Sequence, residues 1–327
     1  MPQEHRNFLF VPKKNYICHS QNNQPPLKRA LLICSIFIII FSVETDAQRS
    51  RWKMVRWELS AGAGASNFLG ELGGANQIGT NYFKDFEWSQ TRFGAALGLR
   101  YRLSEFFSLN THITYGSVSG DDKLTEEFYR NYRNLNFRSH ILEWNLNFEA
   151  AFQQEQVGHR YRLRRVKGQK GYEIYAYGFV GIGVFNFDPK TDYKGVAYRL
   201  QPLGTEGQGL VPSRKKYSLW QLCIPIGFGF KYTIDSKWGV GIEYGMRKTF
   251  TDYIDDVSTS YFDNTALQNA YGSVAAALAD RSPKTNPGIT AAEAQRGDPR
   301  DLDAYMFAIF SINYKMRSSR TGGLPRF

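Results

Sequence analysis

The most constraining feature of the sequence is a strict two-residue period at residues 140–152. Successive side chains of a β-strand point to opposite faces, so this period gives the strand one apolar and one polar face. The apolar members are Leu142, Trp144, Leu146, Phe148, Ala150 and Phe152, and the polar members are Glu143, Asn145, Asn147 and Glu149. Large apolar residues opposite charged ones are typical of a transmembrane β-barrel strand, with lipid on one side and the lumen on the other.

Other segments repeat the pattern and are predicted as further strands. They are residues 56–66, 92–102, 106–117, 172–187, 219–232, 238–247 and 305–316. The segment 172–187 is apolar on both faces near its middle, so the period does not assign its faces. Pro225 lies inside 219–232, and because proline cannot donate a ladder hydrogen bond, we expect a bulge or a bend there.

Long and short connectors alternate along the chain. The connectors after the first, third, fifth and seventh strands are long, those after the second and sixth are tight turns, and the fourth, 153–171, is intermediate. Outer-membrane barrels have long external loops, short periplasmic turns and an even number of strands. The sequence therefore predicts an all-β fold, an eight-stranded antiparallel transmembrane β-barrel with long extracellular loops and both termini in the periplasm.

The amino terminus matches a secretory leader. An apolar run at 30–43 follows two basic residues and leads to Ala47, which is the pattern of a signal peptide cleaved after Ala47. The run is too short for a membrane-spanning helix, which needs about 20 apolar residues. We therefore expect a leader at 1–47 and an outer-membrane barrel domain at 48–327. Cys223 is then the single cysteine of the mature chain, so no internal disulfide is expected.

Charged residues also fall on the inward faces of the predicted strands. A barrel of about eight strands has just enough interior for side chains, so a water-filled channel is not expected. Buried charges left unpaired are costly, so the inward charges should pair across the lumen. The predicted lumenal charge network consists of Arg92, Arg100, Glu143, Glu149, Glu243 and Arg247.

Basic residues gather on the predicted periplasmic side. The fourth connector carries the densest group, Arg160, Arg162, Arg164, Arg165, Lys167 and Lys170, and the formal net charge of the chain is +11. This rim can bind lipid phosphates or dock an acidic periplasmic protein, and the sequence does not separate the two. The connector 251–303 is acidic near its start. Nucleic acid is not an expected partner of a secreted chain.

Cofactor and metal motifs are not supported. The glycines of 62–64 begin like a dinucleotide fingerprint, but Asn67 stands where the third glycine belongs. Asp252, Asp255 and Asp256 could offer oxygen ligands to calcium, yet their spacing fits no standard loop, and a solvated acidic loop is the preferred interpretation. We expect no cofactor and no bound metal.

Catalysis is a distant alternative. Some small barrels are lipid-modifying hydrolases, which need a nucleophile and a base within hydrogen-bond reach. His112 points inward in the predicted strand, whereas a catalytic pair should lie at the lipid-facing surface or the outer rim. A lumenal histidine with satisfied hydrogen bonds is the better account of His112, and we expect a non-enzymatic protein.

Three connector sequences resemble the PorG family. They are SNFLGELGG at 66–74, RNLNFRS at 133–139 and TDYIDDVS at 251–258. PorG-like proteins are outer-membrane β-barrels of Bacteroidetes that are associated with the type IX secretion system and with gliding motility. The resemblance implies an accessory role that ties a periplasmic ring complex of the secretion machine to the outer membrane, and the basic residues of 160–170 would be a plausible contact surface for periplasmic ring proteins.

Two functional hypotheses therefore follow. The first is an accessory component of type IX protein secretion, embedded in outer-membrane lipids and bound to a periplasmic partner. The second is a general small outer-membrane barrel that stabilises the envelope or binds a ligand through its loops. The first predicts a stable periplasmic partner and loss of cargo export on deletion, and the second predicts neither.

Overall fold

The computed structural model describes residues 55–70, 72, 88–152, 174–235 and 237–316 of the chain. The predicted leader lies outside them. The strands are β1 Trp57–Leu69, β2 Arg92–Arg102, β3 Phe107–Asp121, β4 Asn136–Ala151, β5 Ile174–Tyr193, β6 Val196–Arg199, β7 Trp220–Thr233, β8 Trp238–Thr249 and β9 Ala304–Met316. All eight predicted strands are confirmed, and the short β6 is additional.

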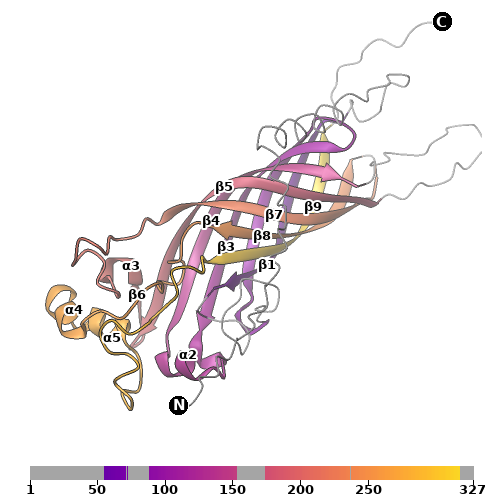
Figure 1. Ribbon diagram of the computed structural model, residues 1–327. Helices are drawn as coiled ribbons and strands as arrows, with labels where there is room; N and C mark the ends of the chain where they lie inside the picture. The colour runs from indigo at the N-terminus through magenta and orange to yellow at the C-terminus, as the bar shows by residue number, and fades with distance from the viewer. Residues whose placement is uncertain (1–54, 71, 73–87, 153–173, 236, 317–327) are drawn as a thin grey trace, which may run out of the picture. The chain divides into compact units, whose positions relative to one another are not determined.

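Eight strands close into an antiparallel barrel (Figure 1). The hydrogen-bonded order is β4-β3-β2-β1-β9-β8-β7-β5, and β5 returns to pair with β4. The first and last strands pair along their whole length, from Trp57 opposite Met316 to Leu69 opposite Ala304. Closure leaves none of the eight strands with an unpaired edge, which is what a barrel needs in a solvent that cannot hydrogen-bond its backbone. β6 pairs only with the far end of β5.

The alternation in β4 is borne out residue by residue. Glu143, Asn145, Asn147 and Glu149 are buried in the barrel interior, whereas Leu142, Trp144, Leu146 and Phe148 are 39–55% exposed on the outer wall. The ladder continues beyond the alternating segment, to Asn136 opposite Asp121 on β3. β3 and β4 are therefore longer than their hydrophobic period predicts.

Pro225 interrupts the pairing of β7 without bulging it. Val180 of β5 pairs with Ile226, and the next registered pair is Gly183 with Cys223, so the same number of residues is skipped on both strands. The register is unchanged across the gap, and β7 keeps its pairing with β8, where Pro225 is opposite Arg247. Of the expected bulge or bend, the register excludes the bulge, because the proline only removes one donor from the β5 side.

The two tight turns lie at one end of the barrel, here called the short-turn end. In the first, the backbone N–H groups of Leu103 and Ser104 donate to the carbonyl of Phe107. In the second, one carboxylate oxygen of Asp235 accepts from the N–H groups of Lys237 and Trp238, at 2.6 and 2.7 Å. β1 begins and β9 ends at this same end.

The long connectors fold over the opposite end, here called the long-loop end (Figure 1). We call the described residues 122–135, 194–219 and 250–303 the loop cap. Its helices and the one beside it are η3 Trp88–Gln90, η4 Asp122–Leu124, α2 Phe128–Arg133, α3 Leu200–Leu203, α4 Asn264–Tyr271 and α5 Ser273–Ala279. Among the described residues, no helix is long and apolar enough to span a membrane.

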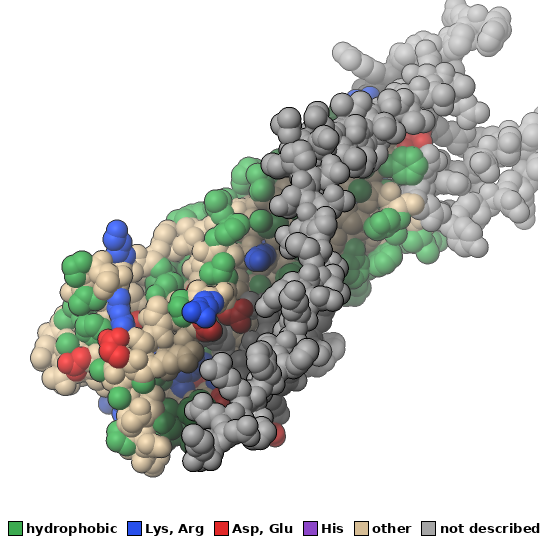
Figure 2. Space-filling model, in the orientation of Figure 1, with side chains coloured by type: hydrophobic (Ala, Val, Ile, Leu, Met, Phe, Trp, Pro, Cys, Tyr) green, Lys and Arg blue, Asp and Glu red, His purple; other side chains and the backbone are tan. Residues whose placement is uncertain are grey.

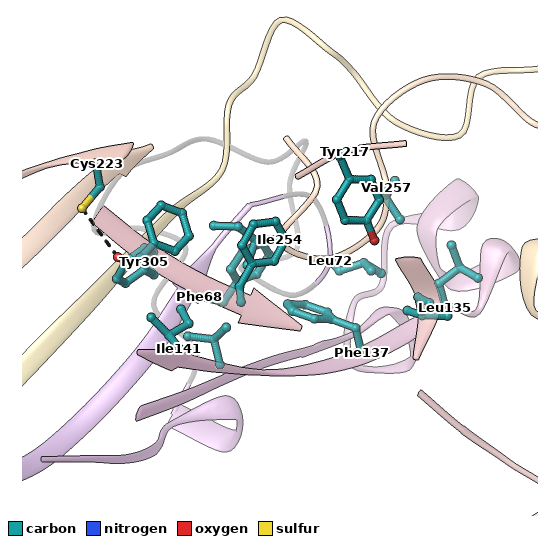
Figure 3. Packing of buried hydrophobic residues seen from close by; sticks show 14 of the residues in the cluster. Phe68, Leu72, Leu135, Phe137, Ile141, Tyr217, Cys223, Ile254, Val257 and Tyr305 are labelled. Carbon is teal, nitrogen blue, oxygen red and sulfur yellow. Dashed lines mark hydrogen bonds between the residues drawn. The ribbon is translucent and has the colours of Figure 1, made fainter. Parts of the chain in front are cut away.

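The main hydrophobic cluster fills the barrel near the long-loop end and continues into the loop cap. Figure 3 shows Phe68, Ile141 and Tyr305 from the barrel strands packed toward Ile254 and Val257 from the connector after β8. Phe185, Phe187 and Phe307 belong to the barrel part and are at most 1% exposed. Barrel and loop cap therefore share one core.

Candidate functional site

The outer wall of the barrel is apolar over the height of a bilayer. Figure 2 shows hydrophobic side chains along the wall, with charged side chains gathered toward the loop end. On β4 the exposed apolar residues run from Leu142 to Phe152. At about 3.3 Å per residue this is roughly 33 Å along a strand. For a strand tilted by about 40° this is roughly 25 Å of height, the height of the apolar band of outer-membrane barrels.

Aromatic side chains ring the short-turn end of this wall. Trp57 is directly opposite Tyr101, with ring centroids 4.7 Å apart, and Trp238 is directly opposite Tyr314, at 4.8 Å. The ring of Tyr232 is also half exposed at this level. Such girdles are found where a membrane barrel meets the headgroup layer, because their rings are apolar and their tips are polar.

The interior near the short-turn end is filled by ion pairs centred on Arg100. Its guanidinium binds Glu149, at 2.6 and 2.8 Å, and Glu58, at 2.9 Å, and it lies 4.7 Å from the ring centre of Tyr177. Lys231 donates to the same oxygen of Glu58 at 2.7 Å. Each of these charged side chains is at most 5% exposed, so the cations and carboxylates neutralise one another where water cannot reach them.

A second group lies nearer the long-loop end. Arg247 binds Glu143, whose carboxylate also accepts from the hydroxyl of Tyr305 at 2.7 Å and from the amide of Asn145. The Tyr305 hydroxyl lies 3.7 Å from the sulfur of Cys223 (Figure 3). Cys223, a free cysteine in the described part of the chain, is buried in the barrel interior.

Between the two groups lies a small polar cavity. Glu243 accepts a hydrogen bond from Tyr177 at 2.9 Å, and one of its oxygens is 3.9 Å from Nδ1 of His112. The cavity beside them has a volume of about 30 Å³. That is room for about one or two water molecules and not for a substrate or a continuous pore.

The structure thus brings five of the six predicted network residues into the barrel interior. Arg92 is the exception, because it is exposed near the long-loop end and binds Ser119 and Gln90. The predicted list omitted Glu58, Lys231 and Tyr177, which also belong to the network. Glu58 and Lys231 lie on the inward parity of their alternating segments, so the same period could have identified them. The aromatic partner could not be found this way, because the faces of 172–187 were not assigned.

Ion pairs also fasten the loop cap. Arg296 binds Glu206 at 2.8 Å, donates to the carbonyl of Asp256 at 2.6 Å, and its own carbonyl accepts from Arg133 at 2.5 Å. These four residues come from all three connectors of the cap. Glu206 further accepts from the hydroxyl of Thr259 and from backbone N–H groups. The cap is therefore held by buried, charge-assisted hydrogen bonds.

The acidic start of the connector 250–303 is buried, so the preferred interpretation as a solvated acidic loop is wrong. Asp255 accepts from the backbone N–H groups of Leu72 and Val257, and Asp256 accepts from the hydroxyls of Thr205 and Tyr217, at 2.5 and 2.6 Å. These two carboxylates therefore stabilise the conformation of the loop by accepting hydrogen bonds within it. Among the described residues, no group of His, Cys, Asp and Glu side chains is arranged to hold a metal ion.

Burial shifts the pKa values of Asp256 and its hydrogen-bond donor Tyr217. It raises the pKa of the Asp256 carboxyl to about 6, although Arg296 and the two hydroxyl donors favour the ionised form. Burial, together with the neighbouring Asp256, also raises the pKa of Tyr217, which therefore stays a neutral donor. Asp256 is thus a buried acid that titrates near neutrality.

The three stretches that resemble the PorG family meet in the core beneath the loop cap. Phe68 packs edge-to-face on Phe137 with ring centroids 4.8 Å apart, and Leu72, Ile254 and Val257 belong to the same buried cluster (Figure 3). The Leu72 N–H also binds Asp255. The resemblance thus coincides with one packing unit, made from three stretches that are far apart in sequence and lie at strand ends and in connectors.

The predicted periplasmic rim, Arg160, Arg162, Arg164, Arg165, Lys167 and Lys170, lies outside the described residues. Its position and contacts remain predictions.

No family model matches the chain, and no curated protein matches it. Solved structures of small barrels align with it. The N-terminal β-barrel domain of Pseudomonas aeruginosa OprF is 9% identical, with a TM-score of 0.32 over 80% of this chain and 98% of that domain.

Two further structures give similar values. The attachment invasion locus protein Ail of Yersinia pestis is 9% identical, with a TM-score of 0.34 over 80% of this chain and 99% of Ail. Neisserial surface protein A is 7% identical, with a TM-score of 0.34 over 80% of this chain and 96% of that one. The class of the present chain, a closed eight-stranded antiparallel β-barrel, rests on its own strand pairing.

Proposed function

We propose that this chain is a non-enzymatic outer-membrane barrel, with both termini in the periplasm and the loop cap outside the cell. The observation that carries the proposal is the outer wall, an apolar band of roughly bilayer height around a closed barrel whose interior is charged. The short-turn end would face the periplasm, because outer-membrane barrels keep their short turns and termini there.

The interior supports a scaffold rather than a channel. Ion pairs fill the barrel near the short-turn end, and aromatic residues of the shared core fill it near the long-loop end. His112 lies beside Glu243 in the enclosed cavity, away from the wall and from the loop cap. A lipid substrate on the outer wall could not reach it. We therefore expect no lipid-modifying activity that depends on His112, so His112→Ala should abolish none.

The finer proposal is an accessory role in type IX protein secretion, linking the outer membrane to a periplasmic ring complex. The resemblance of residues 66–74, 133–139 and 251–258 to the PorG family supports it. Support also comes from the meeting of these stretches in one core, because residues that are far apart in sequence and share the resemblance also pack together. The basic connector 160–170 remains the proposed contact surface.

The test is crosslinking in native outer membranes, followed by purification of the barrel and identification of its partners. Neutralising Arg160, Arg162, Arg164 and Arg165 to glutamine should remove the periplasmic ring proteins from the purified material. A matched variant with four exposed cations of the loop cap neutralised, Lys123, Lys194, Lys215 and Arg300, should retain them. A barrel that purifies alone under crosslinking would contradict the secretion role.

A second candidate is a free-standing barrel that binds a ligand through its loops. An open hollow of about 490 Å³ on the loop cap favours it. The hollow is lined by the ring of Tyr193 and by polar side chains of the helical segment after β8, including Asn264, Gln268 and Arg281. Unimpaired cargo export in a deletion strain would favour this candidate over the secretion role.

A further inference from the structure

Three cations stand in one row across β4, β5 and β6. Arg138 is directly opposite Lys190, and Lys190 is directly opposite Arg199. Directly opposite residues of antiparallel strands project from the same face of the sheet, with Cβ atoms about 5 Å apart. Arg138 has the parity of Leu142 and Trp144, so this face is the outer wall. We call Arg138, Lys190 and Arg199 the cation row.

The fold neutralises this row only in part. Asp188 binds Lys190 at 3.2 Å and Arg199 at 2.8 Å, which leaves Arg138 without an acidic partner among the described residues. Like charges placed directly opposite each other destabilise a sheet. Folding alone therefore gives no reason to collect three cations here.

A hollow of about 190 Å³ lies against the row. Arg138 and Lys190 line it together with Arg92, and two carboxylates, Asp121 and Asp192, lie at the same hollow. Asp121 already caps η4 by accepting from the N–H of Lys123 at 3.0 Å. The hollow thus offers three cationic groups, and one of its two carboxylates is engaged by the backbone.

The row lies at the height of a headgroup layer. Leu142 is the last exposed apolar residue of β4 before it, and Arg138 follows four residues further on. This is about 13 Å along the strand, or roughly 10 Å of height for a strand tilted by about 40°. The His140 ring lies between the two levels, stacked on Tyr115 with ring centroids 6.0 Å apart. The long side chains of arginine and lysine can cover the remaining distance to the edge of the hydrocarbon.

We propose that the cation row binds the phosphate groups of outer-leaflet lipids. This inference rests on the proposed insertion into the outer membrane with the loop cap outside. The acyl chains of the lipid would pack on the apolar wall below the row. Its phosphate would form ion pairs with Arg138 and with Lys190 and Arg199, which share the single carboxylate of Asp188. Arginine suits this task because its planar group binds phosphate through two parallel hydrogen bonds.

The test uses the full barrel in phosphatidylcholine nanodiscs that contain an increasing fraction of diphosphorylated lipid A. Binding is measured by native mass spectrometry. The variant R138Q/K190Q/R199Q should lose at least about tenfold in affinity, since each cation near an anionic surface contributes on the order of fivefold. The control K123Q/K215Q/R300Q removes the same charge from exposed loop positions and should bind like the wild type.

Dephosphorylated lipid A supplies the second arm, and it should bind wild type and cation-row variant equally weakly. Equal binding of diphosphorylated lipid A by wild type and cation-row variant would overturn the inference. So would undiminished wild-type binding of the dephosphorylated form. Incorporation into discs of phosphatidylcholine alone is scored separately, with heat-modifiable gel migration as the check on folding. A wild-type chain that folds but enters no disc would refute the membrane proposal itself.

Discussion

At the scale of single residues, the buried ion pairs of the barrel interior are interdependent. Removing one partner leaves an uncompensated buried charge, which costs about 3–5 kcal/mol, whereas replacing a whole pair by apolar residues can be neutral. Arg100 forms ion pairs with two carboxylates, those of Glu58 and Glu149. It is therefore the residue whose loss should matter most.

We expect Arg100→Leu to lower the free energy of unfolding by about 3–5 kcal/mol. The double variant Arg100→Leu/Glu149→Leu should recover part of the loss, because Glu58 keeps its contact with Lys231. Denaturant titration in lipid, followed by heat-modifiable gel migration, measures both. Arg92→Leu is the control, since Arg92 is exposed and should change stability by less than about 1 kcal/mol. Equal losses for Arg100→Leu and Arg92→Leu would contradict the proposed network.

The loop cap should weaken as the pH rises, because of Asp256. The folded pKa of about 6 lies above the ordinary value of 3.8, so the folded state holds its proton more tightly than the unfolded state. The stabilisation is complete below about pH 4 and is lost as the pH rises to about 6. A pKa difference of about 2 corresponds to roughly 3 kcal/mol.

Asp256→Asn should remove most of this pH dependence, and its amide oxygen keeps an acceptor for one of the two hydroxyls that now donate to Asp256, those of Thr205 and Tyr217. Hydrogen exchange of the cap amides at pH 4.5 and 7.5, corrected for intrinsic rates, gives the local free energy of opening. Asp263→Asn is the matched control, because Asp263 is an exposed helix cap and asparagine caps equally well. A pH dependence that survives in Asp256→Asn would assign the effect to another group.

At the scale of elements, the strands were predictable and the loop cap was not. A two-residue period indicates which face of a strand is apolar. In β4 it identified both faces correctly, because the outer wall is apolar and the interior is polar. Beyond Leu142 the pattern inverts, because the outer face carries Arg138 and His140 while the inner face carries Phe137 and Ile141, so the ends of β3 and β4 were missed. The cap helices are short, and partners from distant connectors stabilise them. Arg296 with Glu206 and Arg133 is one example that no local pattern encodes.

The shared core predicts how the loop cap can be loosened without opening the barrel. Ile254 is fully buried in the loop part of that core, and its backbone N–H donates a hydrogen bond to the carboxylate of Asp303 at 2.8 Å. Ile254→Ala should cost about 2–5 kcal/mol. It should speed hydrogen exchange in 251–303 by at least about 30-fold, with heat-modifiable migration unchanged. Val196→Ala, at an exposed position of β6, should leave exchange in 251–303 unchanged. Unfolding of the barrel by Ile254→Ala would show that cap and barrel are not separable.

At the scale of the whole molecule, two independent layers close the interior. Ion pairs around Arg100 fill the part near the short-turn end, and Phe185, Phe187 and Phe307 fill the part near the long-loop end. The cavity between them holds about 30 Å³. The three phenylalanines of this plug come from barrel strands, and Ile254 and Val257 of the loop cap belong to the same cluster.

Closure should therefore not depend on the helices of the cap. In planar bilayers we expect no steady conductance from the wild type, and none after replacement of residues 264–281 by a short glycine-serine linker, because both layers lie below that segment. A variant of the plug, Phe185→Ala/Phe187→Ala, should also remain closed, since the ion pairs around Arg100 still fill the narrow interior. Adding Arg100→Ala to it removes both layers and is the combination that should first admit ions. Currents from the cap-shortened barrel alone would show that the cap closes the barrel, and currents from the wild type would contradict a scaffold role.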